Sequence, residues 1–193
     1  MTTNSAGGRR RRRVRAGLTL MEIVVVVIII LILSAALTPT LMGVLDRKRA
    51  DAAKESLDAL VLAISDMRAD NQDWPGRLSH LARPITTADR NICGSFYSAG
   101  KVSNWAGPYV SRIIPTTGFP IGIGAVQDSL VREMISGNDS FMKIQVDGVA
   151  VEDALTLDRM YDNDGSAAGT VRWNPPAGDG LVTMFFLRPI RGC

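Results

Sequence analysis

The most constraining feature of this sequence is a long apolar run near its beginning. Between residues 18 and 45 the only charged side chain is that of Glu22, within the stretch LTLMEIVVVVIIILIL. A helix needs about 20 consecutive apolar residues to cross the hydrocarbon core of a bilayer. The run therefore predicts a membrane-spanning helix. Glu22 is an ionisable group inside it, and its desolvation would be costly without a partner.

A basic segment precedes this run. Residues 1–17 hold six of the 22 Arg and Lys residues and no acid, so the rest of the chain has a formal net charge of −3 instead of +3. A run of arginines directly before an apolar span is typical of a segment that stays in the cytoplasm. The alternative is an arm that binds nucleic acid. We predict no direct nucleic-acid contact, and we expect the chain after the run to lie outside the cytoplasm.

The helical pattern continues beyond the apolar run. Five apolar residues recur at helical spacing and leave the charges on the other face, namely Leu57, Leu60, Val61, Ile64 and Met67. Residues 18–71 are therefore predicted to form one helix that stops before Pro75. Its part 46–71 is amphipathic and should pack on a domain, while 18–45 protrudes. We expect Pro39 and Gly43 to kink or loosen this helix.

Residues 72–193 predict a mixed domain. FMKIQV and VAV flank Asp147-Gly148, which favours a tight hairpin with a type I′ turn. EDALTLDRMYD predicts a short helix, and GTVRWN with LVTMFFLRPI predicts a second hairpin. Together these elements indicate an α+β fold, in which an antiparallel sheet of about four strands covers the amphipathic half of the long helix.

The beginning of the apolar run resembles the prepilin signature of type IV pilins and of type II secretion pseudopilins. Gly17 stands before Leu18, Thr19 and Leu20 follow, and Glu22 is the fifth residue after the expected cut. The resemblance covers about residues 9–71, although the family more often has phenylalanine where this chain has Leu18. It implies the type IV pilin-like lollipop, a long N-terminal helix whose C-terminal half packs on an antiparallel sheet.

The same resemblance implies how such a chain is processed. A prepilin peptidase would cut between Gly17 and Leu18, and Leu18 would become the N-methylated amino terminus. The ammonium group of Leu18, its own or a neighbour's, would then pair with Glu22 and set the register between subunits.

The resemblance also implies partners and a location. The partners would be further copies of the chain in a homo-polymer, other pilins or pseudopilins, the peptidase and an inner-membrane assembly platform. The location would be the bacterial inner membrane, crossed once, with a cytoplasmic N-terminus and an extracytoplasmic head. The assembled form would be a periplasmic or cell-surface filament, a pilus or a secretion pseudopilus.

Two other interpretations of the N-terminal region stay open. Ser34-Ala35-Ala36 offers small residues for an ordinary signal-peptide cut, which would release a soluble exported binding domain beginning near Leu37. An unprocessed single-pass anchor is the other alternative. Whether the mature chain retains residues 18–36 separates the first alternative from a filament subunit.

Two small groups of residues are further candidates. Cys93 and Cys193 both fall in the part expected outside the cytoplasm, where a disulfide is favoured over two unpaired thiols. Asp158, Asp162 and Asp164 in DRMYDNDG are a candidate Ca²⁺ site, because carboxylate oxygens are the ligands that this cation prefers. The alternative is a solvated turn, since Met160 breaks the spacing of an EF-hand loop.

A catalytic constellation is not evident in the sequence. His80 is the only histidine, so a triad or a histidine-rich metal site has little to build on. We predict that the chain is a structural protein and not an enzyme.

Overall fold

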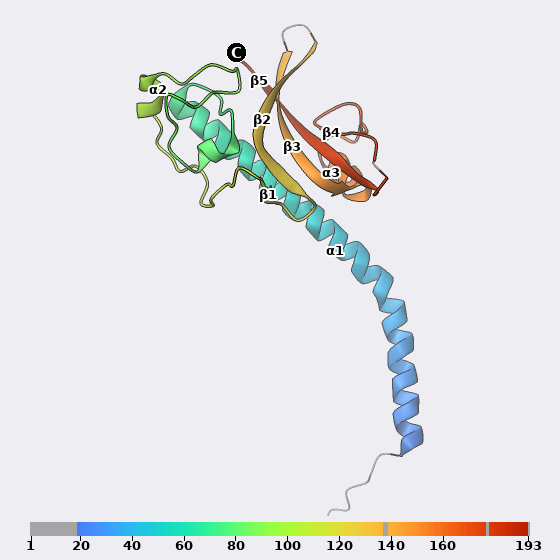
Figure 1. Cartoon of the computed structure of the whole chain (residues 1–193). Coiled ribbons are helices and arrows are strands. Elements are labelled where there is room, and N and C mark those ends of the chain that lie inside the picture. Colours follow the sequence, from blue (N-terminus) through green and yellow to red (C-terminus); the bar gives the residue numbers. More distant parts are fainter. Residues whose placement is uncertain (1–18, 137–138, 177, 193) are drawn as a thin grey trace, which may run out of the picture. The chain divides into compact units, whose positions relative to one another are not determined.

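The computed structural model describes residues 19–136, 139–176 and 178–192, and only the backbone of residues 36–42, 46 and 136. The chain divides into two compact units, Met1–Gly43 and Val44–Cys193. The helix α1, Leu20–Asn71, begins in the first unit and ends in the second (Figure 1). The fold is α+β, as the sequence predicts.

The described part of the first unit is an apolar helix with its side chains in solvent. All side chains of residues 20–35 are exposed. The exposed fraction of the large apolar ones runs from 44% at Val24 to 83% at Leu20. Among the residues of this unit that the structure describes, none covers them.

The membrane-spanning prediction is wrong. A span needs about 20 consecutive apolar residues in one helix. In the part of the chain that the structure describes, no helix combines the length and the apolar character required to cross a membrane. This finding overturns the single-pass inner-membrane location predicted from residues 18–45.

The second unit is built on one antiparallel sheet of five strands, one more than predicted. The strands stand in the order β1-β2-β3-β5-β4 (Figure 1). They comprise β1 Phe119–Pro120, β2 Ala125–Ser136, β3 Asp139–Ala150, β4 Val171–Trp173 and β5 Leu181–Ile190. The predicted β4–β5 hairpin is confirmed, with Val171 opposite Phe186 and Trp173 opposite Met184. The predicted helix is also present, as α3, Val151–Tyr161.

The predicted hairpin at Asp147-Gly148 is wrong. Strand β3 runs through both residues to Ala150, and its pairing with β5 shifts register between Val146 and Val149. Gly148 has φ +71°, the conformation in which a bulge as well as a type I′ turn favours glycine. The bulge keeps both Val146 and Val149 on the buried face.

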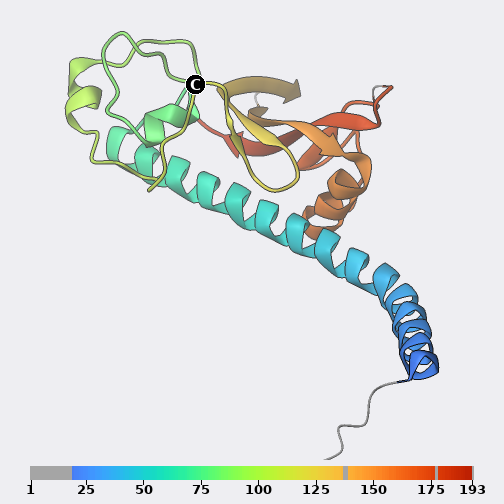
Figure 2. The ribbon, with the colours of Figure 1, turned by 60° about the horizontal axis from the view of Figure 1, so that its bottom comes forward.

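The amphipathic half of α1 packs as its period predicts. Leu57, Ile64 and Met67 are fully buried and Leu60 is 4% exposed, while Val61 is half-buried. They share one hydrophobic core with the inward side chains of the sheet. Figure 2 shows this part of α1 along one face of the sheet. Fully burying one such side chain contributes about 1.5–3 kcal/mol.

Helix α1 ends where the sequence predicts. Gln72 follows Asn71 with φ +53°, and its N–H donates to the carbonyl of Arg68 at 2.7 Å. This is the left-handed cap that satisfies a free carbonyl at a helix end.

A long connection follows between α1 and β1, with two short helices, η1 Leu78–Leu81 and α2 Ala99–Ser103. It is tied to β2 by a bridge between Arg77 and Ser129 and by a hydrogen bond from Leu130 N–H to the carbonyl of Gly76.

Candidate functional site

The first described turn of α1 contains the start of the prepilin-like motif. Thr19 Oγ1 accepts a hydrogen bond from the backbone N–H of Glu22 at 3.2 Å, and the Thr19 carbonyl accepts one from Ile23. Thr19 is therefore the N-cap, and Glu22 is the third residue of the helix. Thr19-Leu20-Met21-Glu22 matches the capping-box pattern, in which an acid at that position is favoured. The exposed Glu22 also lies at the positive end of the helix dipole.

The other residues of the motif stand as follows. Gly17 and Leu18 lie outside the described residues, so the predicted cut, the methylation and the pairing of Leu18 with Glu22 stay predictions. Helix α1 is continuous across Pro39 and Gly43, and a kink there also stays a prediction. Gly43 is exposed, and a Cβ placed on it would meet nothing within 4 Å.

The three aspartates proposed as metal ligands do come together. Asp158 is in the last turns of α3 and is 3% exposed. Asp162 and Asp164 follow directly in the turn after the helix. One ligand atom from each lies within 4.8 Å of the others. Asn163 and Gly165, with φ +54° and +89°, bend the chain so that both carboxylates return toward α3.

The hydrogen bonds of this cluster leave one acceptor unused. The N–H of Gly165 donates to both oxygens of Asp158, at 3.2 and 3.3 Å, and the N–H of Thr170 donates to Asp162 Oδ2. Asp162 Oδ1 is buried without a hydrogen-bond partner among the described residues. A Cβ on Gly169 would collide with the carboxylates of Asp162 and Asp164. The turn thus packs closely around converging oxygens, as a site for a hard cation requires.

Of the two cysteines, the structure describes one. Cys93 is half-buried in the connection before α2 and is disulfide-bonded. Cys193 lies outside the described residues, so the pairing of these two cysteines stays a prediction.

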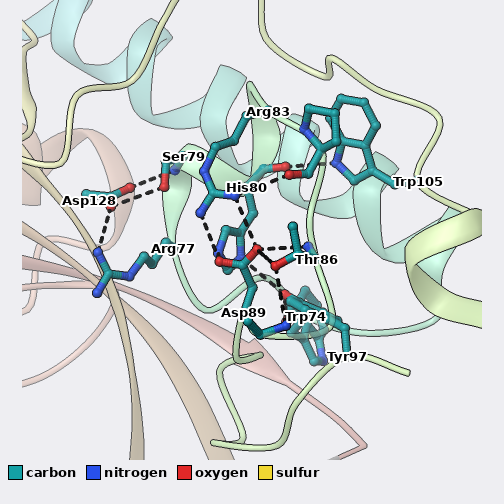
Figure 3. A network of polar contacts seen from close by, with 12 residues as sticks. Trp74, Arg77, Ser79, His80, Arg83, Thr86, Asp89, Tyr97, Trp105 and Asp128 are labelled. Atoms are coloured by element: carbon teal, nitrogen blue, oxygen red, sulfur yellow. Dashed lines mark hydrogen bonds and ion pairs between the residues drawn. The ribbon is translucent and has the colours of Figure 1, made fainter. Parts of the chain in front are cut away.

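A polar network around His80 was not predicted from the sequence. The side chain of His80 is 1% exposed and lies in η1. Its Nδ1 is 3.2 Å from the hydroxyl of Tyr97, and its carbonyl accepts a hydrogen bond from Trp105 Nε1 at 2.9 Å. Figure 3 shows these side chains with Asp89 and Arg83 around the histidine. Burial lowers the pKa of His80, only partly offset by the nearby carboxylate of Asp89.

Asp89 joins two parts of this network. Arg83 donates to its two oxygens at 2.9 and 3.2 Å, and the N–H and hydroxyl of Thr86 donate at 2.8 and 2.9 Å. The hydrogen bonds from Arg83 hold the pKa of Asp89 far below its usual range, against the effect of burial. Asp89 therefore stays ionised throughout the neutral range.

A second buried carboxylate fastens η1 to the sheet. Asp128 on β2 is 2% exposed. It accepts hydrogen bonds from the N–H of Ser79 at 2.7 Å and the hydroxyl of Ser79 at 3.2 Å, and it pairs with Arg77 at 3.5 Å (Figure 3). One sequence signal could have found it. In AVQDSLV, Asp128 alternates with Val126 and Leu130 and so falls on the buried face of the strand, where a carboxylate needs partners.

Comparisons with known proteins add no family to these observations. The chain matches no protein-family model, no curated protein and no solved structure. The residues of the chain itself are therefore the guide to its function.

Proposed function

We propose that this chain is a structural subunit of the type IV pilin or pseudopilin kind, with their fold, and that it polymerises through its apolar N-terminal helix. The peptidase cut before Leu18 and the assembly of further copies, with or without other pilins, are parts of this proposal. Its chemistry belongs to the processing enzyme, and the chain itself is proposed to have no catalytic activity.

The observation that carries the proposal is the exposed apolar helix. Residues 20–35 expose their side chains on every face, with Glu22 as the only charge. Exposed apolar surface of this extent marks an interaction site. Identical helices packed side by side would cover it on all faces. Heterologous contacts, in which different surfaces of neighbouring copies meet, form an open polymer when the rotation between copies does not close a ring.

The first experiment is to determine the mature N-terminus. Intact mass and N-terminal sequencing of the protein recovered from its own cells would show a chain that begins with methylated Leu18. A chain that begins near Leu37 would contradict the proposal, because the polymerising residues would be gone. It would favour the alternative, a binding domain released by an ordinary signal peptide.

The role of Glu22 can be separated from its capping role by two substitutions. Glu22→Gln keeps a residue that a capping box accepts but removes the charge. If the charge pairs with Leu18 of a neighbour, Glu22→Gln and Glu22→Ala should both abolish filaments seen by electron microscopy. Filaments that persist in Glu22→Gln and disappear in Glu22→Ala would assign the residue to helix capping instead.

A second proposal concerns the acidic turn after α3. We infer that Asp158, Asp162 and Asp164 hold Ca²⁺, and the buried, unpartnered Asp162 Oδ1 supports this. When bound, the cation would offset the repulsion between the three carboxylates. It would thereby stabilise the connection between α3 and β4.

Calcium binding is tested by thermal unfolding of the full chain. A ligand that binds only the folded state raises the transition temperature, by a stabilisation that grows with the logarithm of its concentration above Kd. We expect CaCl₂ to raise it and EDTA to reverse the change, with Asp162→Asn abolishing the response. The exposed Asp66 on α1 gives the matched control, Asp66→Asn, which should respond like the unmodified chain. An equal response in both variants would contradict the site.

A further inference from the structure

The connection between α1 and β1 contains a polar cavity outside the sites described above. Its volume is about 300 Å³, and it is lined by His80 of η1 and by residues on either side of this helix. Three guanidinium groups line it, those of Arg77, Arg83 and Arg90, against the single carboxylate of Asp89. When Asp128, which pairs with Arg77, is counted as a second carboxylate, the local formal charge is still positive. The cavity therefore favours an anion.

Two of these arginines, Arg77 and Arg90, are held in place but keep N–H donors for a ligand. Arg77 is 56% exposed and reaches Asp128 through Nη1 alone, at 3.5 Å. Arg90 donates through Nη1 to the carbonyl of Gly94 at 2.5 Å and stacks on Phe96, 3.9 Å from the ring centre. A guanidinium has five N–H donors, so both arginines have N–H groups left for a ligand. Their planar donor geometry suits phosphate and carboxylate oxygens.

His80 adds a second and different requirement. It lines the same cavity, and its buried Nε2 has no hydrogen-bond partner among the described residues, although Asp89 Oδ1 lies 3.5 Å away. Tyr97 donates its single hydroxyl proton to the carbonyl of Trp74 at 3.3 Å. In the tautomer with its proton on Nδ1, His80 donates to the tyrosine oxygen and carries a lone pair on Nε2. In this tautomer Nε2 accepts a hydrogen bond from a donor on the ligand.

We propose that this cavity binds a phosphate group, free or as a small phosphate monoester. Near neutral pH such a group is partly protonated, so it carries both the oxygens that the arginines need and an O–H for His80 Nε2. Sulfate and carboxylate at that pH supply only acceptors. An O–H that His80 Nε2 can accept thus separates phosphate from the other common oxyanions.

The test uses His80 itself as the reporter. It is the only histidine, so its ring gives one set of NMR signals in the full-length chain kept in solution with a nonionic detergent. Sodium phosphate at pH 7 should shift these signals saturably, and sodium sulfate at equal ionic strength should bind about tenfold more weakly. Arg77→Gln should weaken phosphate binding by about tenfold, the effect of one charge-assisted hydrogen bond.

Matched variants keep the proposal falsifiable. Arg159→Gln removes the same charge from an exposed position on α3 and should bind phosphate as the unmodified chain does. Arg90→Gln serves as the second cavity variant if Arg77→Gln does not fold. Titration with glycerol 3-phosphate beside inorganic phosphate shows whether a monoester or the free ion binds more tightly. Absence of a shift, equal binding of sulfate, or equal shifts in Arg77→Gln and Arg159→Gln would each overturn the proposal.

Discussion

Two regions of this molecule depart from the usual distribution of residues, in opposite directions. Residues 20–35 place apolar side chains in solvent, whereas the polar network of Ser79, His80 and Asp128 places polar side chains in the interior. The interior carboxylate Asp128 receives its partners from the chain itself, two from Ser79 and one from Arg77. The apolar side chains of residues 20–35 are covered by none of the described residues of their own unit.

The difference indicates which region depends on other molecules. Buried polar groups that are paired within the chain stabilise one conformation and need no partner. Apolar side chains in solvent forgo a stabilisation of about 25 cal/mol for each Å² of surface left uncovered. The helix 20–35 is therefore the part of the chain whose state should change on assembly, and the pairing of Asp128 with Ser79 and Arg77 is the part that should not.

Among the substitutions of polar residues, the largest effect is expected from unpairing the interior network. Asp128→Ala removes the acceptor of Ser79 N–H and leaves the buried Ser79 groups unsatisfied. We expect a loss of about 3 kcal/mol in the free energy of unfolding, measured by urea denaturation. Asp128→Asn keeps one acceptor and should lose less. A loss below about 1 kcal/mol in Asp128→Ala would mean that the network does not fasten η1 to the sheet.

Acidification should act on the same network through His80. Burial holds the pKa of His80 below its ordinary value of 6.5, so the unfolded chain binds more protons than the folded chain as the pH falls through this range. The contribution of neutral His80 to the free energy of unfolding is thus complete above about pH 6.5. It declines below this pH, by at most about 1.4 kcal/mol per pH unit for one group.

Comparison of urea denaturation at pH 7 and pH 5 measures this effect. The decline should be smaller in His80→Gln, which cannot titrate. The lowered pKa of Asp89 acts in the same direction, but only as the pH falls through its ordinary value of 3.8 and below, so the two contributions separate. An equal decline in both chains would show that His80 is not the group responsible.

A smaller and more local effect is expected at the start of the exposed helix. Thr19→Ala removes the acceptor for Glu22 N–H and should destabilise the first turn by about 1 kcal/mol. Hydrogen exchange of the Glu22 amide in the full chain measures this, with Thr19→Ser as the control that keeps the cap. Unchanged exchange in Thr19→Ala would indicate that the cap does not stabilise this helix end.

The smallest effect is expected from shortening one exposed side chain among residues 20–35. Ile28→Ala shortens a side chain that is 50% exposed and should change the free energy of unfolding by less than about 0.5 kcal/mol. Ile64→Ala makes the same change on the buried half of α1 and should cost about 2–5 kcal/mol. Similar losses in the two variants, measured by urea denaturation, would show that residues 20–35 are covered within the chain.

Local patterns predicted the features that depend on neighbouring residues. The helical period located the buried face of α1, and the stop signal placed its end near Asn71. The three aspartates converge because Asp158 and Asp162 are one helical turn apart and the next residues turn back. Helix α3 and the β4–β5 hairpin were likewise predictable from short stretches.

Features that depend on distant contacts were not predictable in this way. The pattern at Asp147-Gly148 favours positive φ at glycine, which a turn and a bulge both satisfy. The pairing of β3 with β5 selects the bulge. The bond between Ser79 and Asp128 joins residues 49 positions apart, and no local period specifies such a contact. The membrane-spanning prediction considered only composition and length in the sequence, and the described helices do not supply such a span.

The cap at Thr19 has a consequence for how the chain can be shortened. The side chain that begins α1 and the amide that it satisfies both lie within Thr19–Glu22, so the helix start draws none of this support from earlier residues. A peptide bond broken anywhere before Thr19 would leave the first turn with its own terminus intact. Proteolytic trimming of the N-terminal region can therefore change the charge of this end of the molecule without unravelling the helix behind it.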